Sequence, residues 1–349
     1  MDSFIKESLK LELTQRLAAR SLSLMPPLHK LPPKIFRPIF LALERMTGLR
    51  KIELPKVVDY LIPVTSATAE LPEQPEKIKI RVYYPQLIDE ASVTSGKNTE
   101  AHIQQDPDHK RSLVYFHGGG CVVGSIETHD HFCRYLAKHS NMNIISVDYR
   151  LSPEHKFPTP ICDAIDAWNW INYHHKQLNL NPDYIGVGGD SAGGYLACLI
   201  GQTSLQDNLP VQSKTLPNFQ FLLYPMLDLK GVTESYKKFN KHLILTNKLM
   251  DYFRGHYLNT LKEVDLPIVS PLHNPDIKES SNTYILTLGF DPLRDDGIAY
   301  AERLIESGIK VRHEHYPDCM HAFISVAAIS KRAQEATHSV AMALEAFNH

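Results

Sequence analysis

Short apolar runs alternate with longer helix-like segments along most of this chain. Apolar residues at Ile78, Ile80, Val82 and Tyr84 follow a period of two, which predicts a half-buried strand. Further apolar runs, typical of buried strands, occupy residues 112–116, 143–147, 184–187, 219–225, 284–288 and 310–316. Helices are expected between them, at residues 131–139, 162–173, 195–200, 297–306 and 322–346. This alternation predicts an α/β fold, with a mostly parallel central sheet flanked by helices.

Residues 1–55 do not follow the alternation. They combine an amphipathic helix over 1–24, a proline-rich stretch and a second apolar helix over 39–46, and they hold no core of their own. We expect this segment to lie over the main domain as a helical cap. Its pattern fits two roles equally well: part of a lid, or an arm that only packs against the domain. Contact of the basic first helix with a membrane surface is a further interpretation.

Two further segments are polar. Residues 229–266 show no strand pattern and one helix, at 247–258, which predicts a cap insertion above the sheet. Residues 86–110 have no periodicity and are expected to form a long surface loop. The remaining pattern is continuous, so the chain divides into the cap segment 1–55 and a main domain of residues 56–349 that carries the insertion.

Composition limits the classes of partner. The 349 residues carry 37 Lys and Arg against 39 Asp and Glu, so no basic field that would attract nucleic acid is expected. The five cysteines lack CxxC pairs, and we expect reduced, buried thiols. The chain starts with an amphipathic helix rather than a signal peptide, and no run approaches the roughly 20 apolar residues of a membrane span. These features favour a cytoplasmic protein without integral membrane association.

The glycine-rich stretch GGDSAGG, at residues 188–194, stands between an expected strand and an expected helix. A serine nucleophile requires a strained turn that lifts its hydroxyl above the sheet edge, and Gly189 and Gly193 leave room for such a turn around Ser191. The turn also aims the N–H of Ala192 at the place where a carbonyl oxygen would gain negative charge. We predict Ser191 as the nucleophile and Ala192 as an oxyanion donor.

A serine nucleophile needs a histidine base, and the base needs a carboxylate to orient it. In a doubly wound sheet both are expected on loops at the carboxyl ends of strands, in the order Ser, Asp, His. Asp291 stands three residues after the strand that ends at 288, and His321 five after the strand that ends at 316. We predict His321 as the base and Asp291 as its acid, with Asp295 as the alternative acid.

The run HGGG at residues 117–120 follows another expected strand. Gly118 and Gly119 can bring two amide N–H groups close to a developing oxyanion because they carry no Cβ. Together with Ala192 they form the predicted oxyanion hole. His117 is expected to hold the loop rather than to transfer protons.

Histidine and aspartate are adjacent at His129, Asp130 and His131. Metal ligands on a helix recur at three- or four-residue spacing, so we interpret these residues as part of a solvated loop and predict no metal site. The predicted serine chemistry requires neither a metal nor an organic cofactor.

Four motifs occur in a fixed order: HGGG at 117–120, DYRLSPEH at 148–155, GDSAGG at 189–194 and DPLRD at 291–295. Together they resemble the hormone-sensitive-lipase family of α/β-hydrolases, in particular its bacterial carboxylesterase branch with a GDSAG motif. The resemblance extends over roughly residues 78–349.

The resemblance implies an α/β-hydrolase fold with a helical cap, and a carboxylic ester hydrolase that forms an acyl-enzyme on Ser191. It also implies small-molecule esters with short to medium acyl chains as substrates, and a homodimer. The same triad would serve an amidase or an acyltransferase, which the motifs do not separate. A non-catalytic ligand receptor on this fold is a weaker alternative, because Ser191, Asp291 and His321 are all present.

Overall fold

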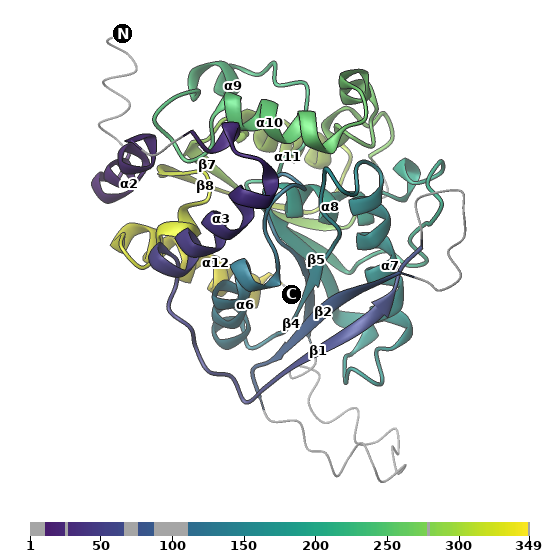
Figure 1. Ribbon diagram of the computed structural model, residues 1–349. Helices are drawn as coiled ribbons and strands as arrows, with labels where there is room; N and C mark the ends of the chain where they lie inside the picture. The colour runs from purple at the N-terminus through teal and green to yellow at the C-terminus, as the bar shows by residue number, and fades with distance from the viewer. Residues whose placement is uncertain (1–10, 25–26, 66–75, 87–110, 278–279, 348–349) are drawn as a thin grey trace.

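The computed structural model describes residues 11–24, 27–65, 76–86, 111–277 and 280–347, and its centre is one eight-stranded sheet (Figure 1). The strands are β1 (Lys56–Pro63), β2 (Lys77–Tyr84), β3 (Ser112–Phe116), β4 (Asn143–Asp148), β5 (Ile185–Asp190), β6 (Phe219–Leu223), β7 (Asn282–Phe290) and β8 (Val311–Met320). Their order across the sheet is β1-β2-β4-β3-β5-β6-β7-β8. Strands β3 to β8 run parallel, and β2 is antiparallel to β1 and β4, which confirms the predicted sheet.

Strand β1 was not predicted from the sequence. It lies at the edge of the sheet and pairs along its whole length with β2, with Val58 opposite Val82. Most of its residues are half-buried or exposed, so Asp59 and the apolar residues around it show neither a continuous apolar run nor a clear alternation. Residues 56–63 therefore form a strand because they pair with β2, and the pattern of their own residues does not predict it.

Helices cover both faces of the sheet (Figure 1). One hydrophobic core lies between the sheet and α7 (Thr159–Tyr173), α8 (Ala192–Ile200) and α11 (Arg294–Glu306). A second core lies between the other face and α6 (Ile126–Ser140) and α12 (Lys331–Ala346). Alternate residues of one strand serve the two cores: Val114 of β3 belongs to the first and Tyr115 to the second. The architecture is a three-layer α/β sandwich.

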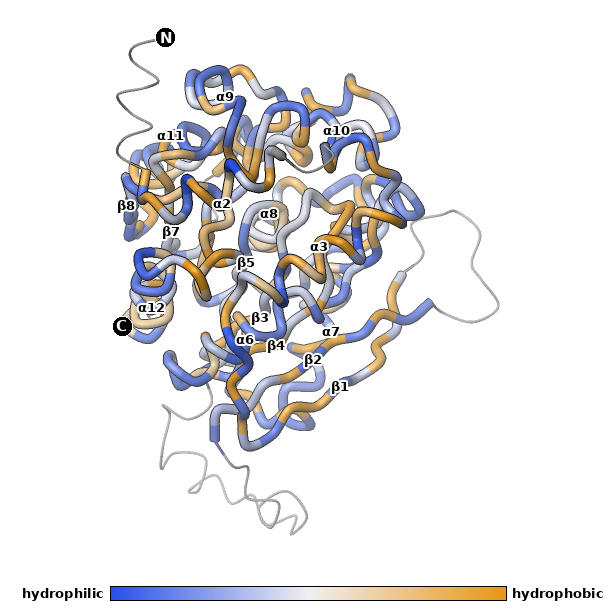
Figure 2. Tube along the Cα trace, turned by 60° about the vertical axis from the view of Figure 1, so that its left-hand side comes forward, coloured by the Kyte–Doolittle hydropathy of each residue, from blue (hydrophilic) through white to orange (hydrophobic). Residues whose placement is uncertain are grey.

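The N-terminal segment and the insertion after β6 contain only helices within the described residues. The N-terminal part forms α2 (Leu13–Leu24), η1 (Leu28–Lys30) and α3 (Pro33–Thr47), and hydrophobic residues occupy much of α3 (Figure 2). The insertion holds α9 (Glu234–Lys238), α10 (Asn247–Tyr257), η5 (Leu261–Asp265) and η6 (Pro271–His273). The two parts meet where the Tyr252 hydroxyl of α10 donates to the Leu31 carbonyl at 3.0 Å. Residues 1–10 of the predicted first helix and 87–110 of the predicted loop lie outside the described residues.

Several predicted helix boundaries were wrong. The predicted closing helix divides into η7 (Phe323–Val326) and α12, because Ser330 caps a new helix by accepting from the Ala333 N–H at 3.1 Å. Helix α3 starts at Pro33 rather than residue 39, since proline is well suited to the first helical position. The short 3-10 helices η3 (Pro182–Tyr184) and η4 (Thr203–Leu205) complete the described elements.

The solvated loop predicted around residues 129–131 was also wrong. These residues belong to α6, which starts at Ile126 after a capping box made by Ser125 and Thr128. His129 and Asp130 are buried, each with 6% of its surface exposed. The prediction failed because the buried polar side chains of this helix have partners that the sequence pattern does not reveal.

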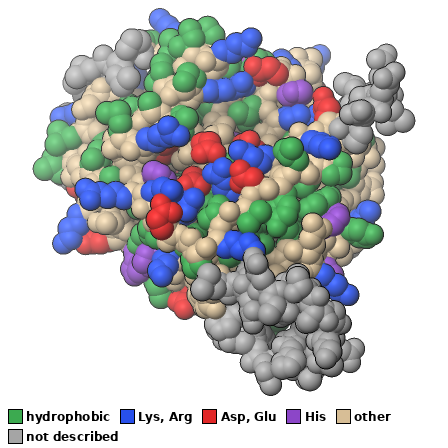
Figure 3. All heavy atoms as spheres, turned by 60° about the horizontal axis from the view of Figure 1, so that its bottom comes forward, with side chains coloured by type: hydrophobic (Ala, Val, Ile, Leu, Met, Phe, Trp, Pro, Cys, Tyr) green, Lys and Arg blue, Asp and Glu red, His purple; other side chains and the backbone are tan. Residues whose placement is uncertain are grey.

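The face of the molecule seen in Figure 3 gives little indication of a charged partner. On the face seen in Figure 3, basic and acidic side chains lie intermixed. No helix in the described parts of the chain is long and apolar enough to cross a lipid bilayer.

Candidate active site

Ser191 occupies the sharp turn between β5 and α8, as the sequence predicts. Its backbone has φ 53° and ψ −117°, a strained conformation for a residue with a side chain. A Cβ on Gly193 would collide with the Phe116 carbonyl oxygen at the end of β3. The turn is held from β6, where the Leu223 carbonyl accepts from the Ser191 N–H at 3.0 Å. The neighbouring strands therefore leave space for this turn only when glycine flanks it.

The structure brings Ser191, His321 and Asp291 together. His321 Nε2 lies 3.0 Å from Ser191 Oγ, and His321 Nδ1 lies 2.8 Å from Asp291 Oδ2. Asp291 is fully buried and His321 is 4% exposed. Asp291 Oδ1 accepts the Leu293 N–H at 2.8 Å, which orients the carboxylate. A carboxylate only accepts hydrogen bonds, so Nδ1 carries the proton and Nε2 is free to accept from the serine hydroxyl.

Asp291 and His321 each follow the last residue of a strand directly. Strand β7 ends at Phe290 and β8 at Met320, so both strands are longer than predicted. The alternative acid, Asp295, does not reach His321: its carboxylate accepts the Ser235 N–H at 2.7 Å and pairs with Arg294.

Sequence analysis missed Tyr224. Its ring packs edge-on against the His321 imidazole with centroids 4.9 Å apart, and its backbone has φ 36°. Tyr224 directly follows β6, and its N–H donates to Leu286 of β7 at 2.8 Å. A tyrosine after a strand carries no distinctive sequence signal, so only the packing reveals that it contacts the histidine.

The glycine loop after β3 differs from the prediction at one position. The Gly118 N–H donates to Asp190 Oδ1 at 2.9 Å, so this amide anchors the loop and does not point at a substrate. The N–H groups of Gly119 and Gly120 donate no hydrogen bond within the described residues. Ala192 begins α8, where the N–H has no partner within the helix. A Cβ on Gly120 would collide with the Phe253 ring of α10, so the insertion packs directly on this loop.

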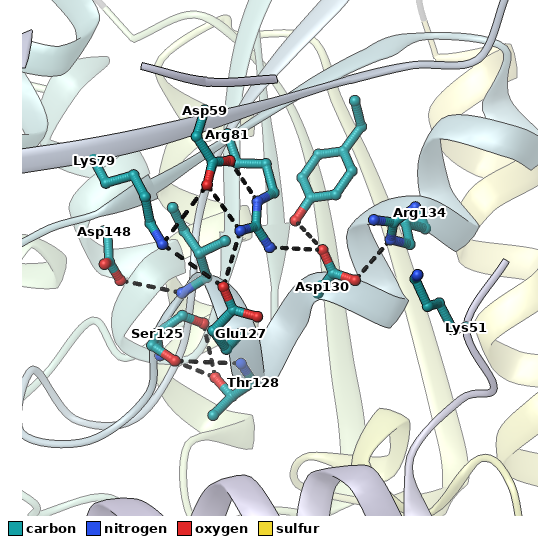
Figure 4. Close-up of polar contacts among 12 residues, drawn as sticks. Lys51, Asp59, Lys79, Arg81, Ser125, Glu127, Thr128, Asp130, Arg134 and Asp148 are labelled. Atoms are coloured by element: carbon teal, nitrogen blue, oxygen red, sulfur yellow. Dashed lines mark hydrogen bonds and ion pairs between the residues drawn. The ribbon is translucent and has the colours of Figure 1, made fainter. Parts of the chain in front are cut away.

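The glycine loop continues into α6, whose first turn is tightly held. Figure 4 shows Arg81 of β2 between Asp59, Glu127 and Asp130, with Arg81–carboxylate contacts of 2.6 to 3.0 Å. Asp130 also accepts from Arg134 at 2.6 Å. These pairs join the sheet edge to α6, so the end of the glycine loop is fixed.

His117 lies behind the loop. Its ring stacks on Tyr149 with centroids 4.3 Å apart, and its Nδ1 lies 2.8 Å from the Gly118 carbonyl. Burial lowers the pKa of His117 to about 3, so the ring is neutral at physiological pH. The described residues contain no group of three or more His, Cys, Asp or Glu side chains that could hold a metal ion.

The fold and the elbow geometry define the class of protein, an α/β-hydrolase. A family model described as the alpha/beta hydrolase fold matches residues 113–325, and the chain belongs to this family, in its hormone-sensitive-lipase-like branch. Two solved structures resemble nearly the whole chain. The α/β-hydrolase enzyme LAE6 from the metagenome of Lake Arreo, Spain, has a TM-score of 0.82 at 30% identity and covers 97% of this chain and 98% of its own. The hyperthermophilic esterase of the archaeon Pyrobaculum calidifontis has a TM-score of 0.79 at 30% identity, with coverages of 97% and 98%.

Curated relatives specify the chemistry further. Carboxylic ester hydrolase LipN of Mycobacterium tuberculosis is 34% identical over 67% of this chain, a match that spans 62% of LipN. Ethyl acetate hydrolase of Pseudomonas putida is 33% identical over 67% of the chain and 72% of its own length. Esterase LipI of Mycobacterium tuberculosis is 31% identical over 83% and 90%. These relatives support a carboxylic ester hydrolase.

Asp296, on the first turn of α11, is a buried carboxyl near the triad. Its Oδ1 has no hydrogen-bond partner in the described structure. Burial, with Asp228 and Asp291 nearby, raises the pKa of Asp296 well above its usual range. The unfolded chain loses this proton near pH 4 and the folded protein keeps it, so the stability that the neutral carboxyl contributes is lost as the pH rises above about 4.

We expect Asp296→Asn to raise the free energy of unfolding by about 1–3 kcal/mol at pH 8, and by much less at pH 4, because the amide has no charge to bury. Urea unfolding at the two pH values measures this. Asp295→Asn is the matched control and should be destabilising, since Asp295 has the partners Ser235 and Arg294. An Asp296→Asn protein with the pH dependence of the wild type would contradict the prediction.

Proposed function

We propose that the protein is a serine carboxylesterase in which Ser191 is the nucleophile, His321 the general base and Asp291 the residue that orients it. The observation that carries the proposal is the continuous hydrogen-bonded chain from Ser191 Oγ through His321 to Asp291, with contacts of 3.0 and 2.8 Å. The relatives named above are ester hydrolases, which favours esters over amides as substrates.

The proposed reaction has two acyl-transfer steps. Ser191 Oγ attacks the ester carbonyl while His321 Nε2 takes the hydroxyl proton, and the C–O bond to the alcohol breaks as His321 returns that proton to the leaving oxygen. Water then attacks the acyl-enzyme by the same route and releases the acid. Gly119, Gly120 and Ala192 supply the N–H groups for the oxyanion. Gly120 replaces Gly118, which the sequence analysis had predicted as a donor. Each such donor contributes roughly 3 kcal/mol in the transition state.

The acyl pocket is proposed to be small, which favours short to medium chains. Its support is the contact between Phe253 of α10 and Gly120, which places an aromatic ring over the loop beside Ser191. The insertion and α2–α3 are proposed to act together as the cap, since Phe36 and Tyr252 pack with ring centroids 6.0 Å apart.

Hydrolysis of a p-nitrophenyl ester series from acetate to palmitate tests this proposal. We expect kcat/KM to be highest at short or medium chains and to fall steeply for the longest. Phe253→Ala should move the optimum to longer chains, because it removes the ring above the loop, while Tyr173→Ala, at an exposed position on α7, should leave the profile unchanged. Equal activity across the series in the wild type would contradict the small pocket.

A cytoplasmic location and a homodimer are further parts of the proposal. The location is supported by five free, buried cysteines, as expected for a reducing compartment. The homodimer is supported by β8, which is the last strand of the sheet and has no neighbouring strand on its outer edge among the described residues. Light scattering of the purified protein measures the mass of the assembly, and a monomer at all concentrations would argue against a dimer.

A further inference from the structure

Asp190, the residue before the nucleophile, is the centre of a buried polar cluster. The residue is buried, with 5% of its surface exposed. Three groups converge on its Oδ1: the Tyr115 hydroxyl at 2.6 Å, the Gly118 N–H at 2.9 Å and His129 Nε2 at 3.3 Å. The Asp190 carboxylate therefore ties the Gly118 amide of the glycine loop to the nucleophile elbow.

The hydrogen bonds around His129 indicate which protons it carries. The Thr128 hydroxyl donates to the Ser125 carbonyl at 2.8 Å, so its only proton is used. His129 Nδ1 lies 2.8 Å from the Thr128 hydroxyl oxygen, and in this arrangement Nδ1 is the donor and the hydroxyl oxygen the acceptor. Nε2 faces a carboxylate, which can only accept. With the hydroxyl proton on the Ser125 carbonyl, both ring nitrogens of His129 are donors, which is the arrangement of an imidazolium.

The charges of the cluster agree with this assignment. Burial alone would lower the pKa of His129, but Asp190 and Glu44 outweigh it and the pKa is raised. Burial would likewise raise the pKa of Asp190, yet His129 and Tyr115 hold it below its usual range. The cation and the anion stabilise each other in a region that excludes water.

Groups from three other elements face this pair. Glu44 of α3 lies beside His129 at a cavity of about 20 Å³ that both residues line, and burial raises the pKa of Glu44 to about 7. The His117 ring, in the loop after β3, lies 5.5 Å from the His129 ring and is neutral. Tyr115 approaches from β3, and His131 and Glu127 line the cavity from α6 itself.

We propose that His129 is a positioning residue for the acyl-transfer reaction: as a cation it holds the Asp190 carboxylate, and through it the Gly118 N–H, so that the next amides of the glycine loop face Ser191. This inference rests on the proposed function. His129 itself is on the helix that follows the loop, and the ion pairs of Arg81 in Figure 4 hold that helix from its outer side. The loop is thus held at both ends, by Asp190 at Gly118 and by α6 after Ser125.

The test measures kcat and KM for His129→Gln, which keeps a neutral hydrogen-bond donor, beside His131→Gln as the matched control on the same helix. We expect kcat of His129→Gln to fall about 10- to 100-fold with KM within about threefold of the wild type, because a displaced oxyanion amide affects the transition state more than the bound ester. His131→Gln should retain kcat. A kcat of His129→Gln within twofold of the wild type would overturn the proposal.

The pH profile separates this role from a merely structural one. As the pH rises through the raised pKa of His129, the cation is lost, so wild-type kcat should decrease on the alkaline side, and His129→Gln should lack this decrease. Glu44→Gln removes one of the acidic neighbours that raise the pKa of His129, so it should move the decrease to lower pH without changing the plateau kcat. It also keeps the proposal testable should His129→Gln fail to fold. An alkaline limb that is unchanged in Glu44→Gln would overturn it.

A double-mutant cycle tests whether His129 acts through Asp190. If it does, Asp190→Asn combined with His129→Gln should lose no more kcat than Asp190→Asn alone, and additive losses would overturn the route. Diethyl p-nitrophenyl phosphate, which phosphorylates a reactive serine and releases p-nitrophenolate, distinguishes this failure from failure of the proposed function.

Release of one equivalent of p-nitrophenolate by the wild type, at a slower rate in His129→Gln, supports both the role of Ser191 and the positioning role of His129. Absence of release by the wild type refutes the role of Ser191.

Discussion

Ser191→Ala is expected to reduce kcat for a short-chain p-nitrophenyl ester by about 10⁵- to 10⁶-fold, with unchanged folding. The reason is that neither His321 nor the oxyanion amides can act on an acyl group without the attacking hydroxyl. The residual rate comes from the oxyanion site and from substrate binding alone. Initial rates at saturating ester, with active protein quantified by thermal unfolding, measure the effect.

Two comparisons make this result specific. Ser339→Ala, at an exposed serine on α12 whose hydroxyl donates to the Glu335 carbonyl at 3.1 Å, should retain full activity. The double variant Ser191→Ala with His321→Ala should be no slower than either single variant, since the two residues act as one unit. Undiminished hydrolysis by Ser191→Ala would refute the assignment of the nucleophile.

Gly193→Ala has the largest expected effect on stability. The added Cβ would meet the carbonyl oxygen of Phe116, and the backbone of Phe116 and His117 belongs to β3 and the glycine loop, neither of which has room to move. We expect the free energy of unfolding to fall by more than about 4 kcal/mol, a large part of the 5–15 kcal/mol typical of a domain. Urea unfolding, or the yield of folded protein when the variant is too unstable to purify, measures the loss.

Gly255→Ala is the matched control. Gly255 is exposed in the last turn of α10, and a Cβ there meets no atom within 4 Å. Because alanine is favoured over glycine inside helices, this variant should be more stable by about 0.5–1 kcal/mol. Similar destabilisation by both substitutions would mean that the crowding at Gly193 is not the cause.

The agreement between sequence and structure is best where a local pattern carries the information. The run at residues 112–116 matched a buried strand residue for residue, because a strand covered on both faces is built mostly from apolar side chains. Strand β1 escaped notice because an edge strand has one neighbour and exposes much of its surface. The start of α6 was missed because buried polar residues such as His129 and Asp130 look like a loop when their partners are unknown.

The sequence by itself determined the parallel sheet, the glycine turn at Ser191 and the order of serine, aspartate and histidine, since each depends on residues close together in the chain or on strand ends. Only the tertiary structure decided between Asp291 and Asp295 as the partner of His321. It places Asp291 Oδ2, after β7, 2.8 Å from His321 Nδ1, after β8. It also moved Gly118 from the predicted oxyanion hole to an anchor on Asp190, and it placed Tyr224 and His129 beside the site. These are long-range contacts of buried polar groups, and their geometry depends on how separate elements pack rather than on any local pattern.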